Sequence, residues 1–177
     1  MSVIPTSAPK TPQLIPVALI SLKLQDPISV LKNDAYSHAI NLVNIKDGTI
    51  STVPNDLGLE LEVSGIQGID HITANTEVGV NRLDCKIYGK TPGGNGVYVH
   101  YYGLIKATPE IGAVLGNKAK VADFDDEYIT STPVISFADS VEDKYKWVLR
   151  ESIIGKGRFI RDDTHLYVQY YLYVLKW

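Results

Sequence analysis

The chain has 177 residues, which is close to the usual length of a single domain. It carries 17 Lys and Arg against 20 Asp and Glu, and the net charge of −3 lacks the basic surplus typical of nucleic-acid-binding domains. Its single cysteine, Cys85, excludes an intramolecular disulfide. No apolar run approaches the roughly 20 residues that a membrane helix needs. We therefore expect a cytoplasmic protein with no nucleic-acid or membrane partner.

The first 16 residues are rich in Pro, Ser and Thr. They lack the basic region, apolar core and cleavage site of a secretory signal. We expect residues 1–16 to form a flexible leader, and residues 17–177 to form one domain.

Short apolar or alternating runs, separated by turn residues, then predict a series of strands. Their ranges are 14–25, 41–45, 48–53, 57–63, 69–75, 81–90, 97–105, 128–137, 146–154 and 165–177. The dipeptide Asp47-Gly48 predicts a hairpin turn, and 57–63 (LGLELEV) alternates strictly. Residues 108–117 predict one short helix capped by Thr108. Many short strands and little helix indicate an antiparallel barrel or sandwich.

Four segments stand in the order and spacing of a known family. They are 68–71 (GIDH), the hairpin 83–103, 128–133 (YITSTP) and a closing block of YKW at 145–147, GKGR at 155–158 and the tyrosine-rich last strand. In these features the chain resembles the bacterial and fungal domain-of-unknown-function family numbered 3237. The resemblance implies a single, closed antiparallel β-barrel of lipocalin-like or allene-oxide-cyclase-like shape. It implies no particular reaction.

The chain also departs from the family pattern at three places. Gly93–Gly96 (GGNG) replaces an Asp-Gly hairpin tip, 135–137 (ISF) stands where Phe-Glu-Thr is common, and 147–149 (WVL) where Trp-Leu-Asn is common. A carboxylate and an amide that could serve a shared site are therefore missing here.

The hairpin 83–103 carries the densest set of titratable residues. With a side-chain period of two, one face of its two strands collects a continuous polar patch. The members of this patch are Asp84, Lys86, Tyr88, Tyr98, His100 and Tyr102. Proton transfer needs such a mixture, with His100 as base and Tyr102 or Lys86 as donor to a developing oxyanion. The alternative is that the patch is simply the solvated outer face of a barrel strand.

Asp70 is the fourth candidate catalytic residue, beside His100, Tyr102 and Lys86. If it is buried, desolvation would raise the pKa of its carboxyl and make it a base near neutral pH. The alternative is a turn aspartate that caps backbone amides after Gly68.

Aromatic side chains with polar tips suit the wall of a cavity for a flat, partly polar ligand. The candidate substrate-binding residues are Tyr88, Tyr98, Tyr101, Trp147, Tyr171 and Tyr173. Tyrosine is equally enriched at interfaces, so the last strand's tyrosines leave a homodimer open, and Trp147 is also a natural core anchor.

The four His residues are dispersed and show no metal-binding spacing, and GKGR is not a phosphate-binding loop. We expect no metal and no cofactor. The residues favour a cofactor-independent isomerase or cyclase that acts by general acid–base catalysis. Its substrate would be a hydrophobic, oxygenated small molecule of secondary metabolism, such as a polyketide, terpenoid or phenolic intermediate. A non-catalytic lipocalin-like binding protein is the alternative, and a structural oligomer is a third.

Overall fold

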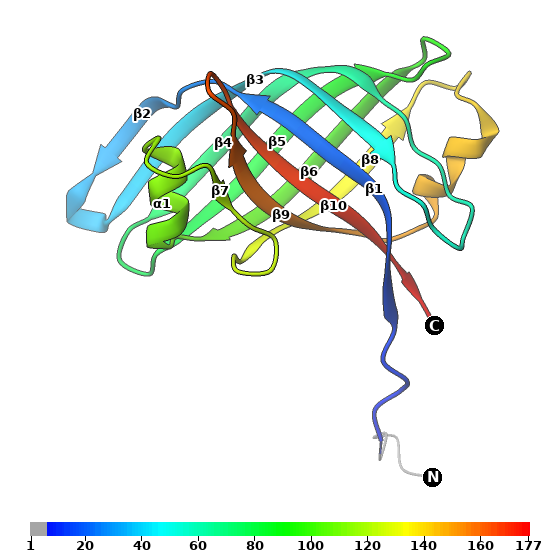
Figure 1. Cartoon of the computed structure of the whole chain (residues 1–177), viewed down its shortest axis with the longest axis horizontal. Helices are drawn as coiled ribbons and strands as arrows, with labels where there is room; N and C mark the ends of the chain where they lie inside the picture. The colour runs from blue at the N-terminus through cyan, green and yellow to red at the C-terminus, as the bar shows by residue number, and fades with distance from the viewer. Residues whose placement is uncertain (1–6) are drawn as a thin grey trace.

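Eight antiparallel strands close into a barrel in the computed structural model, which describes residues 7–177 (Figure 1). These strands are β1 (Gln13–Leu24), β3 (His38–Thr52), β4 (Ser64–Asn75), β5 (Val80–Lys90), β6 (Gly96–Lys106), β8 (Ile129–Phe137), β9 (Ile153–Arg161) and β10 (Leu166–Lys176). Their order around the barrel is β1-β10-β9-β8-β6-β5-β4-β3, and a second pairing of β3 with β1 closes the ring. The predicted closed antiparallel β-barrel is confirmed.

The remaining elements decorate the ends of the barrel. The short strand β2 (Ile28–Asn33) pairs with β3, and η1 (Asp34–Tyr36) links the two. The helix α1 (Pro109–Leu115) and β7 (Val121–Ala122) lie near one end, whereas the 3-10 helix η2 (Asp143–Leu149) lies near the other (Figure 1). None of the helices within residues 7–177 is both long enough and apolar enough to cross a membrane.

The predicted leader, residues 1–16, lies partly outside the described residues. Its last four residues belong to β1, which begins at Gln13. Pro16 sits opposite Tyr173 at an irregularity of the ladder between Pro16 and Ala18. Because proline cannot donate a ladder hydrogen bond, such an irregularity is where a strand tolerates it.

The predicted hairpin turn at Asp47-Gly48 is instead part of the 15-residue strand β3. Its pairing with β1 shifts by one residue between Lys23 and Leu24, so the dipeptide marks a bulge. At Gly48 an added Cβ would lie 2.7 Å from the Ser21 carbonyl oxygen. The glycine is therefore explained by a close approach of β1 to β3.

Residues 57–63 alternate as a strand would, yet they form a loop that covers the η2 end of the barrel. Only Val63 makes a bridge, to Ile50, while the side chains of Leu61 and Val63 are buried. The Trp147 indole in η2 donates to the Glu60 carbonyl oxygen at 2.7 Å. This end of the barrel is thus filled by side chains, and any cavity has to open at the α1 end.

Candidate functional site

The β5–β6 hairpin brings its polar residues together in the predicted way. Asp84 pairs with Tyr102, Lys86 with His100 and Tyr88 with Tyr98. The patch faces outward, however, and Tyr88 and Tyr102 are 58% and 60% exposed. The inward face of the same hairpin carries Leu83, Cys85, Ile87, Val99 and Tyr101, all buried.

The centre of this outer patch is an ion cluster around one carboxylate oxygen. Asp84 Oδ1 accepts from Lys86 Nζ at 2.6 Å and lies 2.8 Å from His100 Nε2. The Lys86 hydrogen bond, aided by His100, lowers the pKa of Asp84, and the same bond raises the pKa of Lys86. These groups satisfy one another at the surface.

Asp70 is separated from that cluster by the thickness of the barrel wall. Its side chain points inward from β4 and is only 7% exposed. Two residues earlier, Gly68 allows β4 and β5 to approach, because a Cβ there would collide with the Lys86 carbonyl oxygen. Asp70 pairs with Cys85, which in turn pairs with Tyr101. Of the four predicted catalytic residues, Asp70 thus lies inside, whereas Lys86, His100 and Tyr102 lie on the outer face.

The Asp70 carboxyl is an unusual group for a barrel interior. Its Oδ1 is buried and has no hydrogen-bond partner within residues 7–177. Burial raises its pKa from 3.8 to about 7, and the nearby Asp84 charge adds to this, although an Asp84 backbone hydrogen bond partly opposes it. A carboxyl with such a pKa exchanges a proton readily at neutral pH.

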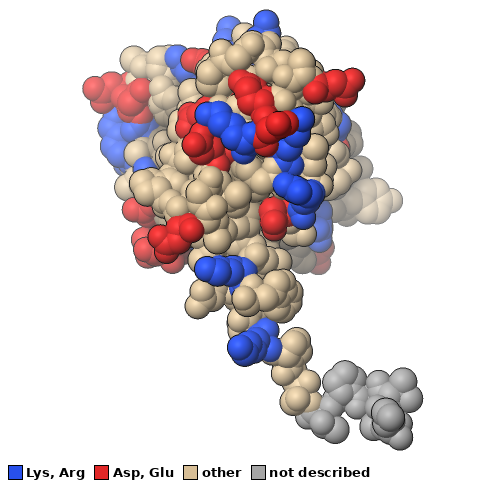
Figure 2. Space-filling model, turned by 90° about the vertical axis from the view of Figure 1, so that its right-hand side faces the viewer, with Lys and Arg blue, Asp and Glu red and all other residues tan. Residues whose placement is uncertain are grey.

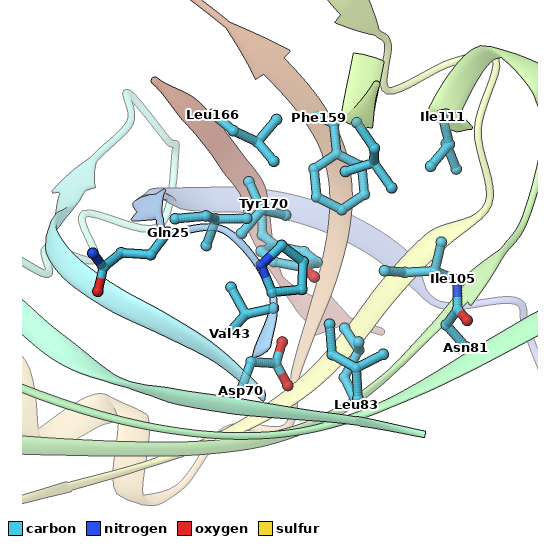
Figure 3. Close-up of a pocket in the computed structure, with 15 residues that line it drawn as sticks. Gln25, Val43, Asp70, Asn81, Leu83, Ile105, Ile111, Phe159, Leu166 and Tyr170 are labelled. Atoms are coloured by element: carbon cyan, nitrogen blue, oxygen red, sulfur yellow. The ribbon is translucent and has the colours of Figure 1, made fainter. Parts of the chain in front are cut away.

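Asp70 lies on the floor of an interior cavity of about 90 Å³ at the α1 end (Figure 3). In Figure 3 its side chain lies between Val43 and Leu83, across the cavity from Phe159 and Leu166. The lining is almost wholly apolar apart from Asp70, Gln25, Asn81 and Tyr170. The cavity reaches the surface at a rim that includes the exposed Pro27 and Leu115.

Two tyrosines lie beside this floor. Tyr101 and Tyr170 are buried, their ring centroids are 5.6 Å apart, and burial raises the pKa of both phenols well above the usual value. The Tyr101 hydroxyl has no hydrogen-bond partner in the described part of the chain. Tyr170, absent from the predicted substrate-binding residues, lines the cavity. Tyr170 alternates in phase with the apolar Val168 and Leu172 along the last strand, and this alternation is the sequence signal that could have found it.

The other predicted substrate-binding residues lie away from the cavity. Tyr88 and Tyr98 face outward on the hairpin, and Trp147 is buried at the opposite end of the barrel. Tyr171 and Tyr173 are on the outer face of β10, where Tyr171 packs on Phe124 with ring centroids 5.0 Å apart. The expectation that this face of the last strand lines the cavity is therefore wrong, because in a filled eight-stranded barrel the apolar face turns inward.

Within residues 7–177 there is no cluster of three or more His, Cys, Asp or Glu side chains that could hold a metal ion. Acidic and basic side chains are interspersed over the η2 end (Figure 2). Two of the ion pairs there are Lys144–Glu60 at 2.7 Å and Lys146–Asp143 at 2.6 Å. This end thus offers no single-sign surface for a charged ligand.

Comparison with known proteins shows which family the chain matches. Residues 12–175 match the family described as protein of unknown function (DUF3237). The chain belongs to this family. No curated protein matches it. The expected family membership is confirmed over nearly the whole chain.

Solved structures share the barrel. A conserved protein of unknown function from Rhodopseudomonas palustris has a TM-score of 0.73 at 17% identity, covering 94% of this chain and 99% of its own. A β-barrel-like protein from Acinetobacter baumannii has a TM-score of 0.63 at 22% identity, covering 96% and 99%. A protein from Penicillium herquei, described as an enzyme, has a TM-score of 0.51 at 16% identity, covering 93% and 98%. These similarities establish the fold.

Proposed function

We propose that this chain is an isomerase or cyclase that uses its own side chains, without a cofactor, on a hydrophobic, oxygenated small molecule. A polyketide, terpenoid or phenolic intermediate is the substrate class that fits the apolar cavity. The observation that carries the proposal is the buried Asp70 carboxyl on the floor of that cavity, with a pKa of about 7 and with its Oδ1 lacking a hydrogen-bond partner among the described residues.

Asp70 acts as the general acid–base group in this proposal. As a carboxylate, it takes a proton from a carbon next to a carbonyl group or from a hydroxyl, and as the acid it returns the proton to another atom of the same molecule. No proton or electron is gained or lost overall, so the chemistry is an isomerisation or ring closure. The raised pKa places both protonation states within reach at neutral pH, where a general base is most effective.

The cavity wall supports this role by excluding water and by limiting what enters. A volume of about 90 Å³ is small beside the roughly 300–1,000 Å³ of typical ligand pockets. Only the reacting end of a larger substrate therefore reaches Asp70, while its remainder lies at the rim near Pro27 and Leu115. The Tyr170 side chain lines the same cavity.

The description of the Penicillium herquei protein as an enzyme supports a catalytic role, since it has the same fold. Because fold alone does not fix function, this support is secondary to the Asp70 cavity.

The proposal is tested by proton exchange. Small cyclic ketones and enones in D₂O serve as probes, and loss of the α-proton NMR signal measures the exchange. We expect wild-type protein to accelerate exchange and Asp70→Asn to lose at least about 100-fold of that rate, the usual contribution of a general base. His100→Ala, on the outer face, is the matched control and should exchange at the wild-type rate. Equal rates for Asp70→Asn and wild type would contradict the proposal.

The second candidate is a non-catalytic binding protein. It is favoured by the largely apolar lining, in which Asp70 is the only ionisable carboxyl. A binder predicts no exchange above buffer on any probe, and apolar probes held at least as tightly by Asp70→Asn as by wild type. The exchange and binding measurements together therefore separate the two functions.

A further inference from the structure

The mouth of the interior cavity adjoins a second, more polar pocket, here called the vestibule. It has a volume of about 140 Å³ and shares part of its wall with the cavity. The shared residues are Leu24, Gln25, Pro27, Leu115 and Leu166. The vestibule adds polar and charged residues to them, namely Asp26, Arg161, Thr164 and His165. A ligand that extends from the floor through the mouth would therefore pass from apolar to polar surroundings.

Arg161 is an inward-facing residue of β9 at this mouth. It pairs with Leu166 of β10, and two residues earlier Phe159 pairs with Val168. Phe159, Leu166 and Val168 all line the cavity, and residues opposite each other on neighbouring strands share a face. The register thus places a guanidinium group at the open end of an apolar wall.

The charge of Arg161 has no counter-charge in the described part of the chain. Its Nε donates to the Val114 carbonyl oxygen at 3.2 Å, and its Nη2 donates to the Leu115 carbonyl oxygen at 3.4 Å. These contacts with the last turn of α1 hold the side chain but use only two of its five N–H donors. None of the salt bridges within residues 7–177 includes Arg161. Because a guanidinium stays protonated, the vestibule contains a held cation with donors to spare.

Two carboxylates lie close to Arg161 in sequence or in the vestibule, and neither forms an ion pair with it. Asp162 accepts from the His165 amide with Oδ1 at 2.6 Å and from the Tyr167 hydroxyl with Oδ2 at 3.2 Å. Asp26 lines the vestibule but is exposed to water. The free donors of Arg161 are thus available to an anionic group from outside the chain.

We propose that the vestibule binds a carboxylate of the substrate, held by Arg161, while a carbonyl group of the same molecule lies at Asp70. This inference rests on the proposed function for the carbonyl end, and it narrows the substrate class to apolar keto acids. A carboxylate is the matching group because an arginine can donate two parallel N–H bonds to its two oxygens. The apolar wall between the two ends accommodates the hydrocarbon part of such a molecule.

The spacing of the two ends follows from the strands. Gly157 of β9 pairs with Tyr170, which lies beside the floor of the cavity, and Arg161 is four residues further along the strand. At about 3.3 Å per residue, Arg161 lies roughly 13 Å from the level of the floor. In Figure 3 the intervening Phe159 lies across the cavity from Asp70. The carboxylate and the carbonyl of the substrate are therefore at opposite ends of an elongated molecule.

Two linear probes test this assignment by isothermal titration calorimetry. The first has a methyl ketone at one end and a carboxylate roughly 13 Å away, and the second is its uncharged primary amide. We expect wild type to bind the acid at least about 10-fold more tightly than the amide, because a hydrogen bond to a charged group adds this much affinity. Arg161→Met should lose the preference for the acid, with the Kd of the amide nearly unchanged.

Arg158→Met is the matched control. Arg158 is on the same strand, but it pairs with Gln169 on the outer face and forms an ion pair with Asp123 at 3.1 Å. This variant should keep the full preference for the acid. The proposal would be overturned if wild type bound neither probe or both equally, or if the preference survived in Arg161→Met. It would equally fail if Arg161→Met weakened the acid and the amide by the same factor, since Arg161 would then only anchor α1.

The outcome can be separated from that of the exchange assay on Asp70. Neutral cyclic ketones need no carboxylate site, so their exchange can succeed while the acid and the amide bind equally. That result would remove the role of Arg161 and keep the catalytic role of Asp70. Conversely, a preference for the acid without proton exchange on any probe would support the vestibule and contradict Asp70 as the base.

Discussion

Asp70 and Asp84 lie on the neighbouring strands β4 and β5. Asp70 pairs with Cys85, the residue that follows Asp84. Their carboxyls nevertheless respond in opposite directions. Burial raises the pKa of Asp70 to about 7, whereas hydrogen bonds from Lys86 and His100 lower the pKa of Asp84. The two faces of one barrel wall thus shift the pKa of an aspartate carboxyl in opposite directions.

This difference shows which titratable residues are available for chemistry. The Asp84 carboxylate is already paired with Lys86 and His100, and all three side chains are partly exposed to water. On the inner face, the Asp70 Oδ1 and Tyr101 Oη atoms are buried and unpartnered within the described residues. A buried polar group without a partner costs free energy, and this cost is consistent with a group kept for a ligand.

Substituting Asp70 should have the largest effect on stability. Because its pKa rises from 3.8 to about 7 on folding, the native state binds more protons than the unfolded chain between these values. Stability is therefore lost as pH rises through that window. Asp70→Asn removes the cost of charging, so we expect it to raise the free energy of unfolding by about 4 kcal/mol at about pH 8, and by less than about 1 kcal/mol at about pH 4.

Urea unfolding at the two pH values measures this change. A variant that is less stable than wild type at the higher pH would show that Asp70 has a compensating partner in solution. Asp84→Asn, measured in parallel, controls for loss of a negative charge as such.

The second largest effect is expected in the rate of cysteine labelling, which should differ between the inner and outer faces of the barrel wall. Cys85 is buried, and burial raises the pKa of its thiol well above the usual value. We expect a thiol reagent to modify native wild-type protein at least about 100-fold more slowly than a cysteine introduced on the outer face by Tyr102→Cys in a Cys85→Ser background. Similar labelling rates at the two positions would contradict the assignment of the faces.

The pH dependence of exchange should distinguish the two aspartates with a somewhat smaller effect. If the Asp70 carboxylate is the base, the rate should increase by roughly 50-fold between about pH 5 and about pH 7 and then level off. Asp84→Asn should keep this pH profile. If the base were instead in the outer cluster, Asp84→Asn would change the profile. The rate of exchange of the same ketone probes, measured across the pH range, gives the profile.

The sequence predicts the hairpin register correctly but leaves its orientation open. Alternation of Leu83, Cys85 and Ile87 with Asp84 and Lys86 sets which residues share a face. It does not state which face is inside when both faces carry tyrosines. The titratable groups favour the polar face as the site, whereas the energetics of filling a narrow barrel put the apolar face inside.

The residues around Asp70 show no clear alternation of apolar and polar side chains. Its candidacy depends instead on its place in the family-like GIDH element at 68–71. Its burial depends on β3 and β5 on either side, which are contacts distant in sequence. The same limitation explains the two local errors. Asp47-Gly48 has the composition of a turn but is explained by an approach of β1, and 57–63 has the pattern of a strand but only one bridge to Ile50.

The smallest expected effect belongs to the outer cluster. The lowered pKa of Asp84 means that its contribution to stability is present above its unfolded pKa and is lost as pH falls through the lower folded pKa. This slope is opposite to that of Asp70. Because exposed ion pairs are worth about 0–1 kcal/mol, Asp84→Asn should cost less than about 1 kcal/mol at neutral pH, and the cost should shrink in high salt. Urea unfolding at low and high salt measures it. A loss of several kcal/mol that is insensitive to salt would mean that the cluster is buried in solution, and would place Asp84 in the same class of environment as Asp70.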